Sequence, residues 1–256
     1  MVIFIRLCYT RTNIATAYSR QVPKGSDHLK KKSKVSESVQ LGIILALSGG
    51  LMDAYTYVCR GHVFANAQTG NLLLIGINLS EGSIGTALLY TYPVLAFTLG
   101  IIAANTAKHS YGRGRRMHWM QITIFMEALI LLGVGFLPQS LNILANCLVS
   151  FACGIQVQSF RTMKGNGIAT TMCIGNLRTA THYICDYFYE KDAGLARKGL
   201  LYYAIIVVFI IGAIIGYKFV KLWAEKAIIV SSILMLMGFV MLFFEGEGEG
   251  EKRKAV

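Results

Sequence analysis

The sequence predicts an all-α integral membrane protein, a polytopic bundle of about six transmembrane helices. Two observations predict this fold class. Of the 256 residues, 54% are hydrophobic and only 15% are charged, whereas a soluble domain usually carries about 25% charged residues. The apolar residues also form long runs of roughly 20 residues, which is the length that an α-helix needs to cross the hydrocarbon core. A helix satisfies its own backbone hydrogen bonds where no water is present, so each run is expected to span the bilayer.

Six spans are predicted. In chain order they cover residues 41–58, 84–107, 119–137, 141–160, 200–220 and 227–244. Pro93 lies inside the second span and is expected to kink it, because proline removes a backbone hydrogen bond. Pro138 marks a tight turn between the third and fourth spans. The membrane domain is therefore expected to cover residues 41–244, with halves 41–137 and 141–244.

Polar tails flank this domain. Residues 1–40 contain eight Lys or Arg residues and lack a clean signal-peptide pattern. We expect this segment to be a basic, disordered cytoplasmic tail. The segment 245–256, EGEGEGEKRKAV, has low complexity and is likewise predicted to be a disordered, charged tail.

Two segments between the spans are ambiguous. Residues 63–79 are apolar enough to enter the bilayer, and residues 168–188 show a weaker version of the same pattern. With six spans and a cytoplasmic N-terminus, 21 of the 25 Lys and Arg residues fall on the cytoplasmic side, which is a strong positive-inside bias. A seventh full span at 63–79 would move Arg113, Arg115 and Arg116 outside. We therefore predict that 63–79 is re-entrant, or a broken segment that continues into the second span.

Charge and motifs exclude several classes of protein. A formal net charge of +12 would suggest nucleic acid as the partner of a soluble protein, but here the basic residues gather at the ends of apolar runs, where they contact lipid. The expected partner is the lipid bilayer and not nucleic acid. The six cysteines form no CxxC pair and have no metal-ligand spacing with a histidine. No HExxH, GxSxG or Walker A motif occurs, so we expect no metal, no cofactor and no enzymatic activity.

The two halves share one layout, in which an apolar helix precedes a segment containing Gly-Asn-Leu and two further helices. An offset of 105 residues aligns Gly70 and Asn71 with Gly175 and Asn176. Residue identity is sparse, so the shared order of elements is the better evidence. Because each half holds three spans, the second half would enter the membrane from the opposite side. This predicts a 3+3 inverted repeat, an arrangement found in many secondary transporters.

In such transporters, broken helices from the two halves form the binding site near the midplane. The candidates here are Thr69, Gly70 and Asn71 in the first half, and Gly175 and Asn176 in the second. Glycine frees the backbone, and the amide of asparagine can satisfy exposed backbone groups or a ligand. The alternative is that both segments are ordinary polar turns at helix starts.

Polar side chains within the spans are the other candidates for substrate or ion binding. Asp53 lies in the first span, where an acid costs at least ~2.5–3.5 kcal/mol, so it is a candidate to bind a cation or proton. The alternative is that it caps nearby backbone at the outer interface. Glu127 lies near the middle of the third span and either carries a proton or makes a structural hydrogen bond. Gln156 and Gln158 lie on the fourth span, and either line the same cavity or join helices through hydrogen bonds.

Gly212 and Gly216 form a GxxxG pattern on the fifth span. This pattern permits close helix packing. It fits packing within the bundle as well as a contact between two copies, so a homo-oligomer stays open.

Several phrases of the sequence resemble the YoaK family of bacterial membrane proteins. They are GLMDA at 50–54, GHVFANAQTGN at 61–71, GIQVQSFR at 154–161, ATTM at 169–172 and GNL at 175–177. The likeness covers roughly residues 38–245. One departure is Ile174, where the family typically has threonine, which weakens a role for that hydroxyl. The resemblance implies a multi-pass protein of the bacterial plasma (inner) membrane, of unknown function, and it carries over no catalytic residue.

Two hypotheses about function follow. The first is a small-solute secondary transporter or permease that binds its solute, with a cation or proton, near Asp53, Asn71, Gln158 and Asn176. The second is a non-transporting membrane scaffold or assembly protein that binds partners.

Overall fold

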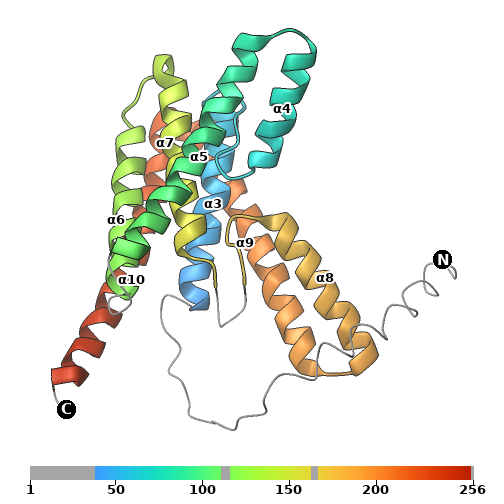
Figure 1. The fold of residues 1–256 in the computed structure, drawn as a ribbon, viewed down its shortest axis with the longest axis vertical. Helices are drawn as coiled ribbons and strands as arrows, with labels where there is room; N and C mark the ends of the chain where they lie inside the picture. The colour runs from blue at the N-terminus through green and yellow to red at the C-terminus, as the bar shows by residue number, and fades with distance from the viewer. Residues whose placement is uncertain (1–37, 111–115, 163–166, 255–256) are drawn as a thin grey trace, which may run out of the picture. The chain divides into compact units, whose positions relative to one another are not determined.

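The computed structural model describes residues 38–110, 116–162 and 167–254, and these residues form helices and connecting turns with no strand among them (Figure 1). The predicted all-α membrane bundle is thereby confirmed. In chain order the helices are α3 (Val39–Cys59), α4 (Gln68–Ser80), α5 (Ile84–Ser110), α6 (Arg116–Val134), η3 (Gln139–Leu141), α7 (Asn142–Ser159), α8 (Cys173–Glu190), α9 (Ala193–Trp223), η4 (Ala224–Ile228) and α10 (Ile229–Lys254). The predicted basic tail lies outside the described residues up to residue 37.

Four stretches are long and apolar enough to cross a membrane, judged by length and composition. They are Val39–Cys59, Ile84–Ser110, Gln139–Ser159 and Ala193–Phe244, and Trp119–Val134 is a shorter apolar helix. The last of the four contains two helices, α9 and α10, because the chain leaves helical geometry at Ala224, where φ is 46°. The six predicted spans thus correspond to α3, α5, α6, α7, α9 and α10.

The ambiguous segment 63–79 forms no extra span. Its helix, α4, has 13 residues and is about 20 Å long, which is too short for a hydrocarbon core of ~30 Å. After α3, the chain runs back into the bundle as a loop, and α4 then returns toward the end at which α3 finished (Figure 1). Segment 168–188 likewise forms one helix that does not continue a neighbouring span: α8 packs against α9, starts near the middle of the bundle and runs away from α4 (Figure 1).

Helix α3 packs along α9, and glycines make this packing close. A Cβ added to Gly50 would collide with the carbonyl oxygen of Phe209, and one added to Gly212 would collide with the carbonyl oxygen of Leu47. A Cβ on Gly216 would lie 2.9 Å from the Cα of Leu51. The GxxxG pattern therefore serves packing within the bundle.

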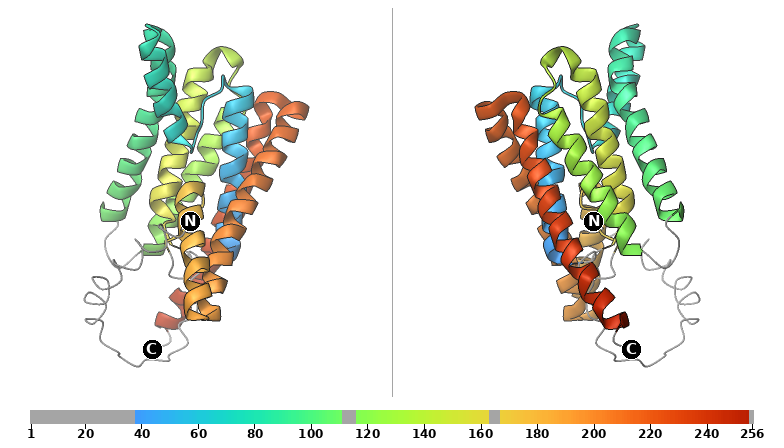
Figure 2. Two further views of the ribbon diagram at one scale, coloured as in Figure 1. Left: turned by 90° about the vertical axis from the view of Figure 1, so that its right-hand side faces the viewer. Right: turned by 90° about the vertical axis from the view of Figure 1, so that its left-hand side faces the viewer.

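Helix α5 packs along α7 in the same manner. A Cβ added to Gly100 would collide with the carbonyl oxygen of Phe151, and one added to Gly154 would collide with that of Phe97. Helices α6 and α10 pack against each other on the face turned toward the viewer in the right-hand view of Figure 2. The two most extensive helix contacts, α3 with α9 and α5 with α7, thus join the first half of the chain to the second.

Arg60 fastens the end of α3 to the turn between α6 and α7. Its side chain is fully buried, and Nε donates to the hydroxyl of Tyr55 at 2.7 Å. The two Nη atoms donate to four oxygens. These are the carbonyls of Pro138 at 3.1 Å, Val134 at 3.3 Å and Leu137 at 2.8 Å, and Asn142 Oδ1 at 3.0 Å. All five N–H groups of the guanidinium are therefore used.

Two helices run past their predicted ends. Helix α9 begins at Ala193 and not at 200, because the side chain of Asp192 caps it by accepting from the N–H of Gly194 at 2.7 Å. The structure also differs from the predicted disordered tail at 245–256, since α10 continues as helix to Lys254. Helix α5 passes through Pro93, and a kink there stays a prediction.

Candidate functional site

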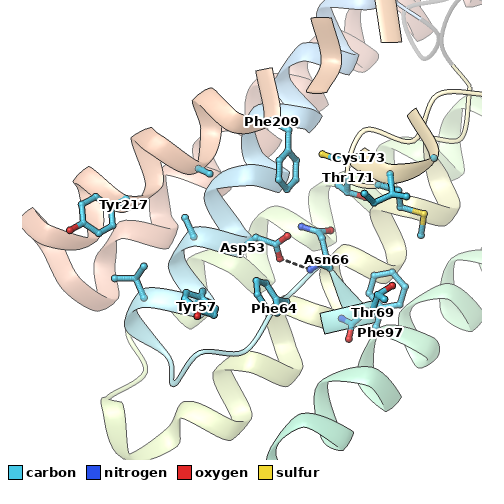
Figure 3. A pocket seen from close by; sticks show the side chains of 18 residues that line it. Asp53, Tyr57, Phe64, Asn66, Thr69, Phe97, Thr171, Cys173, Phe209 and Tyr217 are labelled. Carbon is cyan, nitrogen blue, oxygen red and sulfur yellow. Dashed lines mark hydrogen bonds between the residues drawn. The ribbon is translucent and has the colours of Figure 1, made fainter. Parts of the chain in front are cut away.

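One cavity of about 680 Å³ lies between α3, α5, α9 and the starting ends of α4 and α8 (Figure 3). This volume is in the range of small-molecule sites. The polar side chains of its lining are Asp53, Asn66, Gln68, Thr69, Thr171 and Cys173. The aromatic ones are Tyr57, Phe64, Phe97, Phe209 and Tyr217. Both predicted Gly-Asn segments reach this cavity, through Gln68 and Thr69 in the first half and through residues 173–175 in the second.

Asp53 lines the cavity and also bonds to nearby backbone. Its side chain is buried, with 8% exposed, and Oδ1 accepts a hydrogen bond from the backbone N–H of Asn66 at 2.6 Å (Figure 3). Asn66 in turn donates through Nδ2 to the carbonyl of Gly49 at 3.1 Å. The backbone N–H groups of Ala65 and Ala67 also lie near this carboxylate, and Asp53 has no ion-pair partner among the described residues. The carboxylate therefore holds the loop before α4 and lies in the wall of the cavity.

Asn71 and Asn176 hold their loops in the same way. Asn71 Nδ2 donates to the carbonyl of Phe64 at 2.7 Å, and Asn71 Oδ1 accepts from the N–H of Phe64 at 3.0 Å. Asn176 Nδ2 donates to the carbonyl of Ala169 at 2.6 Å. Each asparagine thus bonds to the residue seven positions before it. Both side chains are buried and neither lines the cavity, so they satisfy backbone groups as the alternative interpretation held.

The two glycines of these segments differ. A Cβ added to Gly70 would lie 2.7 Å from the ring of Phe64, so a larger residue would displace that aromatic side chain. Gly175 has open space around it and lines the cavity. Ile174, which departs from the family pattern, also lines the cavity and has 80% of its surface exposed.

Helix α8 starts at the cavity without a side-chain cap. Its N-cap residue is Met172, which makes no capping hydrogen bond. The first backbone bond at this end is from the N–H of Asn176 to the carbonyl of Met172, so the N–H groups of residues 173–175 have no helical partner. The hydroxyl of Thr171 is buried and has no hydrogen-bond partner among the described residues. This end of the cavity therefore offers hydrogen-bond donors and the positive end of a helix dipole.

Besides Gly70, Asn71 and Asn176, three further predicted site residues do not line the cavity. Gln156 Nε2 donates to the carbonyl of Leu45 at 3.1 Å, and Gln158 Nε2 donates to Asn105 Oδ1 at 3.2 Å. Both glutamines thus join helices, which was the alternative to lining the cavity. Glu127 is buried in α6 with 1% of its surface exposed, and its Oε1 has no partner among the described residues. The structure does not bring Glu127 into the site that contains Asp53.

Sequence reasoning missed several residues of the site. Asn66 and Thr171 lie within the phrases that resemble the YoaK family, and this was the one signal that could have found them. Phe209 and Tyr217 lie in an apolar span, where nothing in the sequence separates a cavity-lining aromatic residue from one that packs or faces lipid. No group of three His, Cys, Asp or Glu side chains suited to a metal ion occurs in the described part of the chain.

The fold and this site define a polytopic α-helical membrane protein with a cavity at the starting ends of α4 and α8. A family model described as "Protein of unknown function (DUF1275)" matches residues 41–241, and the chain belongs to this family. It is 26% identical over 184 residues to the UPF0700 transmembrane protein YoaK of Bacillus subtilis (strain 168), an alignment that covers 67% of this chain and 79% of that protein. The resemblance to the YoaK family is thus confirmed. No solved structure matches the chain.

Proposed function

We propose that this protein is a small-solute secondary transporter or permease and that the cavity at Asp53 is its solute site. One observation carries the proposal: segments from both halves of the chain, each starting a short or uncapped helix, meet at a single cavity of about 680 Å³ that also contains a buried carboxylate. Secondary transporters bind their solutes at such junctions of discontinuous helices. A scaffold protein has no need of an internal cavity of this kind.

Pairing between the halves supports an inverted repeat, which the proposal includes. The packing of α3 on α9 has a counterpart in that of α7 on α5, and α4 on α5 has a counterpart in α8 on α9. Asn71 and Asn176, aligned at the offset of 105 residues, make the same hydrogen bond. Two such halves can rock against each other around a fixed site and expose it to either side in turn.

We further propose that the chain lies in the bacterial inner membrane with both termini in the cytoplasm. The positive-inside bias supports this orientation, since 21 of the 25 Lys and Arg residues fall on one side. Reporter fusions at the two ends test it. Two cytoplasmic termini are expected, and an outer location for either terminus contradicts the scheme.

Uptake and efflux in proteoliposomes, with and without a pH gradient, test transport itself. Asp53→Asn should reduce the flux of any transported solute, because it removes the carboxylate from the cavity while the amide oxygen can still accept from Asn66. Asp186→Asn is a matched control. Asp186 lies on α8, pairs with His182 at 3.4 Å and does not line the cavity. No flux across a broad solute panel, together with stable co-purification of defined partners, would favour the membrane scaffold instead.

A further inference from the structure

The cavity has one negative end and one end rich in donors, and the difference between these ends indicates a class of solute. The inference rests on the proposed function, because it concerns the same site. At the negative end lies the Asp53 carboxylate, which accepts from loop backbone. Among the described residues, no Lys, Arg or His side chain lines the cavity. No described cation therefore pairs with this carboxylate, and a solute cation can do so.

At the opposite end, α8 presents the N–H groups of residues 173–175 and the hydroxyl of Thr171. Thr171 is 4% exposed, its Oγ1 has no partner in the described part of the chain, and it lines the cavity. A buried hydroxyl without a partner costs free energy unless a ligand accepts from it. Together with a helix N-terminus, it suits a carboxylate or another small anionic group.

The two halves differ in whether a carboxylate lies at the start of the helix, α4 in the first half and α8 in the second. In the first half, Asp53 accepts from the loop that leads into α4. At the offset of 105 residues the second half has Gln158, which bonds instead to Asn105 on α5 and does not line the cavity. The start of α8 therefore has no carboxylate from the position that serves α4. A solute carboxylate can take that place.

The two ends lie close together along α3. A Cβ added to Gly49 would lie 2.8 Å from the methyl group of Thr171. Gly49 and Asp53 are four residues apart on α3, so they lie on one helix face about one turn, or ~5.4 Å, apart. An α-amino acid carries its two charges only a few bonds apart, so it suits a site whose two ends are near neighbours, with a charge-assisted hydrogen bond at each end.

The remaining walls are apolar and aromatic. Phe64 and Phe209 lie on either side of Asp53, Phe97 lies near Thr69, and Tyr57 stacks on Phe64 with ring centroids 4.9 Å apart (Figure 3). Such walls favour an apolar solute body, and aromatic faces also attract an ammonium group. We infer that the cavity binds a zwitterionic amino acid with an apolar or aromatic side chain, its ammonium group at Asp53 and its carboxylate at Thr171 and the N-terminus of α8.

Equilibrium binding to the full chain in lipid nanodiscs tests this inference with four probes of similar size. L-phenylalanine carries both charges, phenylalaninamide only the cation, N-acetyl-L-phenylalanine only the anion, and hydrocinnamamide neither. We expect L-phenylalanine to bind about 10-fold or more tightly than each of the others, as the loss of a charge-assisted hydrogen bond implies. Equal affinities for all four probes, or the tightest binding by a singly charged one, would overturn the inference.

Two variants assign the charges to the two ends. Asp53→Asn should weaken L-phenylalanine and phenylalaninamide and leave N-acetyl-L-phenylalanine unchanged. Thr171→Val, which is nearly isosteric and breaks no hydrogen bond found in the structure, should weaken L-phenylalanine and N-acetyl-L-phenylalanine only. Asp186→Asn should resemble the wild type throughout. If both variants weaken all probes equally while remaining monodisperse, the assignment is wrong.

Binding and flux separate this inference from the proposed function. Selective binding of L-phenylalanine without flux in proteoliposomes would support the zwitterion site and contradict transport. Flux of another solute, with no preference for L-phenylalanine in nanodiscs, would support transport and overturn the zwitterion site.

Discussion

Replacing Arg60 by methionine removes five donated hydrogen bonds from the end of α3 and keeps an unbranched side chain. The carbonyls of Val134, Leu137 and Pro138 then lose their donor. Each stranded buried acceptor costs about 1–3 kcal/mol, but the variant also avoids the cost of burying a guanidinium. Removing one side of a buried charged network typically costs ~3–5 kcal/mol, and we expect Arg60→Met to lower the free energy of unfolding by about this amount.

Reversible unfolding in mixed micelles, followed by circular dichroism, measures this change. Arg60→Lys should fall between wild type and Arg60→Met, because lysine keeps the charge but offers three donors without the planar fork. Arg197→Met is the matched control, since Arg197 is exposed at the start of α9 and donates no hydrogen bond that the structure describes. If Arg60→Met stays within ~1 kcal/mol of the control, the network does not fasten α3 as argued.

The remaining predictions concern packing, the loop asparagines and the buried acid. Gly50→Ala should destabilise the protein by about 1–3 kcal/mol in the same assay, because its Cβ would meet the Phe209 carbonyl. Gly76→Ala, with nothing within 4 Å, should be neutral or stabilising. Equal effects of the two substitutions would contradict the close packing of α3 on α9. Asn176→Ala should speed backbone hydrogen exchange at residues 168–172, because the Ala169 carbonyl loses its donor. Mass spectrometry measures this exchange, and an unchanged rate would mean that other contacts hold this loop. Glu127→Gln should keep both stability and solute binding, because an amide is easier to bury than a carboxylate and this side chain does not line the cavity; a loss of L-phenylalanine binding in nanodiscs would contradict its placement.

The membrane bundle could be predicted because it depends on local properties of the chain. The length of each apolar run and the side on which Lys and Arg gather are readable from the sequence alone. Asp53 could be found for the same reason, since an acid within a span is costly wherever its partners lie. Thr69 and Gly175 followed from the Gly-Asn phrases, and both line the cavity.

The residues that escaped prediction depend on contacts between distant segments. Arg60 counted only as a charge in an outer loop, whereas four of its five acceptors lie 74 to 82 positions away, where α6 ends and α7 begins. Gln158 aligns with Asp53, but its amide bonds to α5 instead of lining the cavity. Phe209 faces the cavity from a span whose apolar residues extend all round the helix, so no hydrophobic face marked it.

The proposed repeat gives a physical reason to look for function where the halves differ. The halves share the hydrogen bonds from Asn71 and Asn176 to loop carbonyls. These bonds fix the loop before each helix, and the need of buried carbonyl groups for a donor explains them without a ligand. Two helix N-termini directed at one cavity add two positive partial charges, and an equal pair of acids would neutralise both. The chain supplies one, Asp53. The start of α8, with the unpartnered hydroxyl of Thr171 beside it, is therefore the end of the site at which we expect a solute carboxylate to bind.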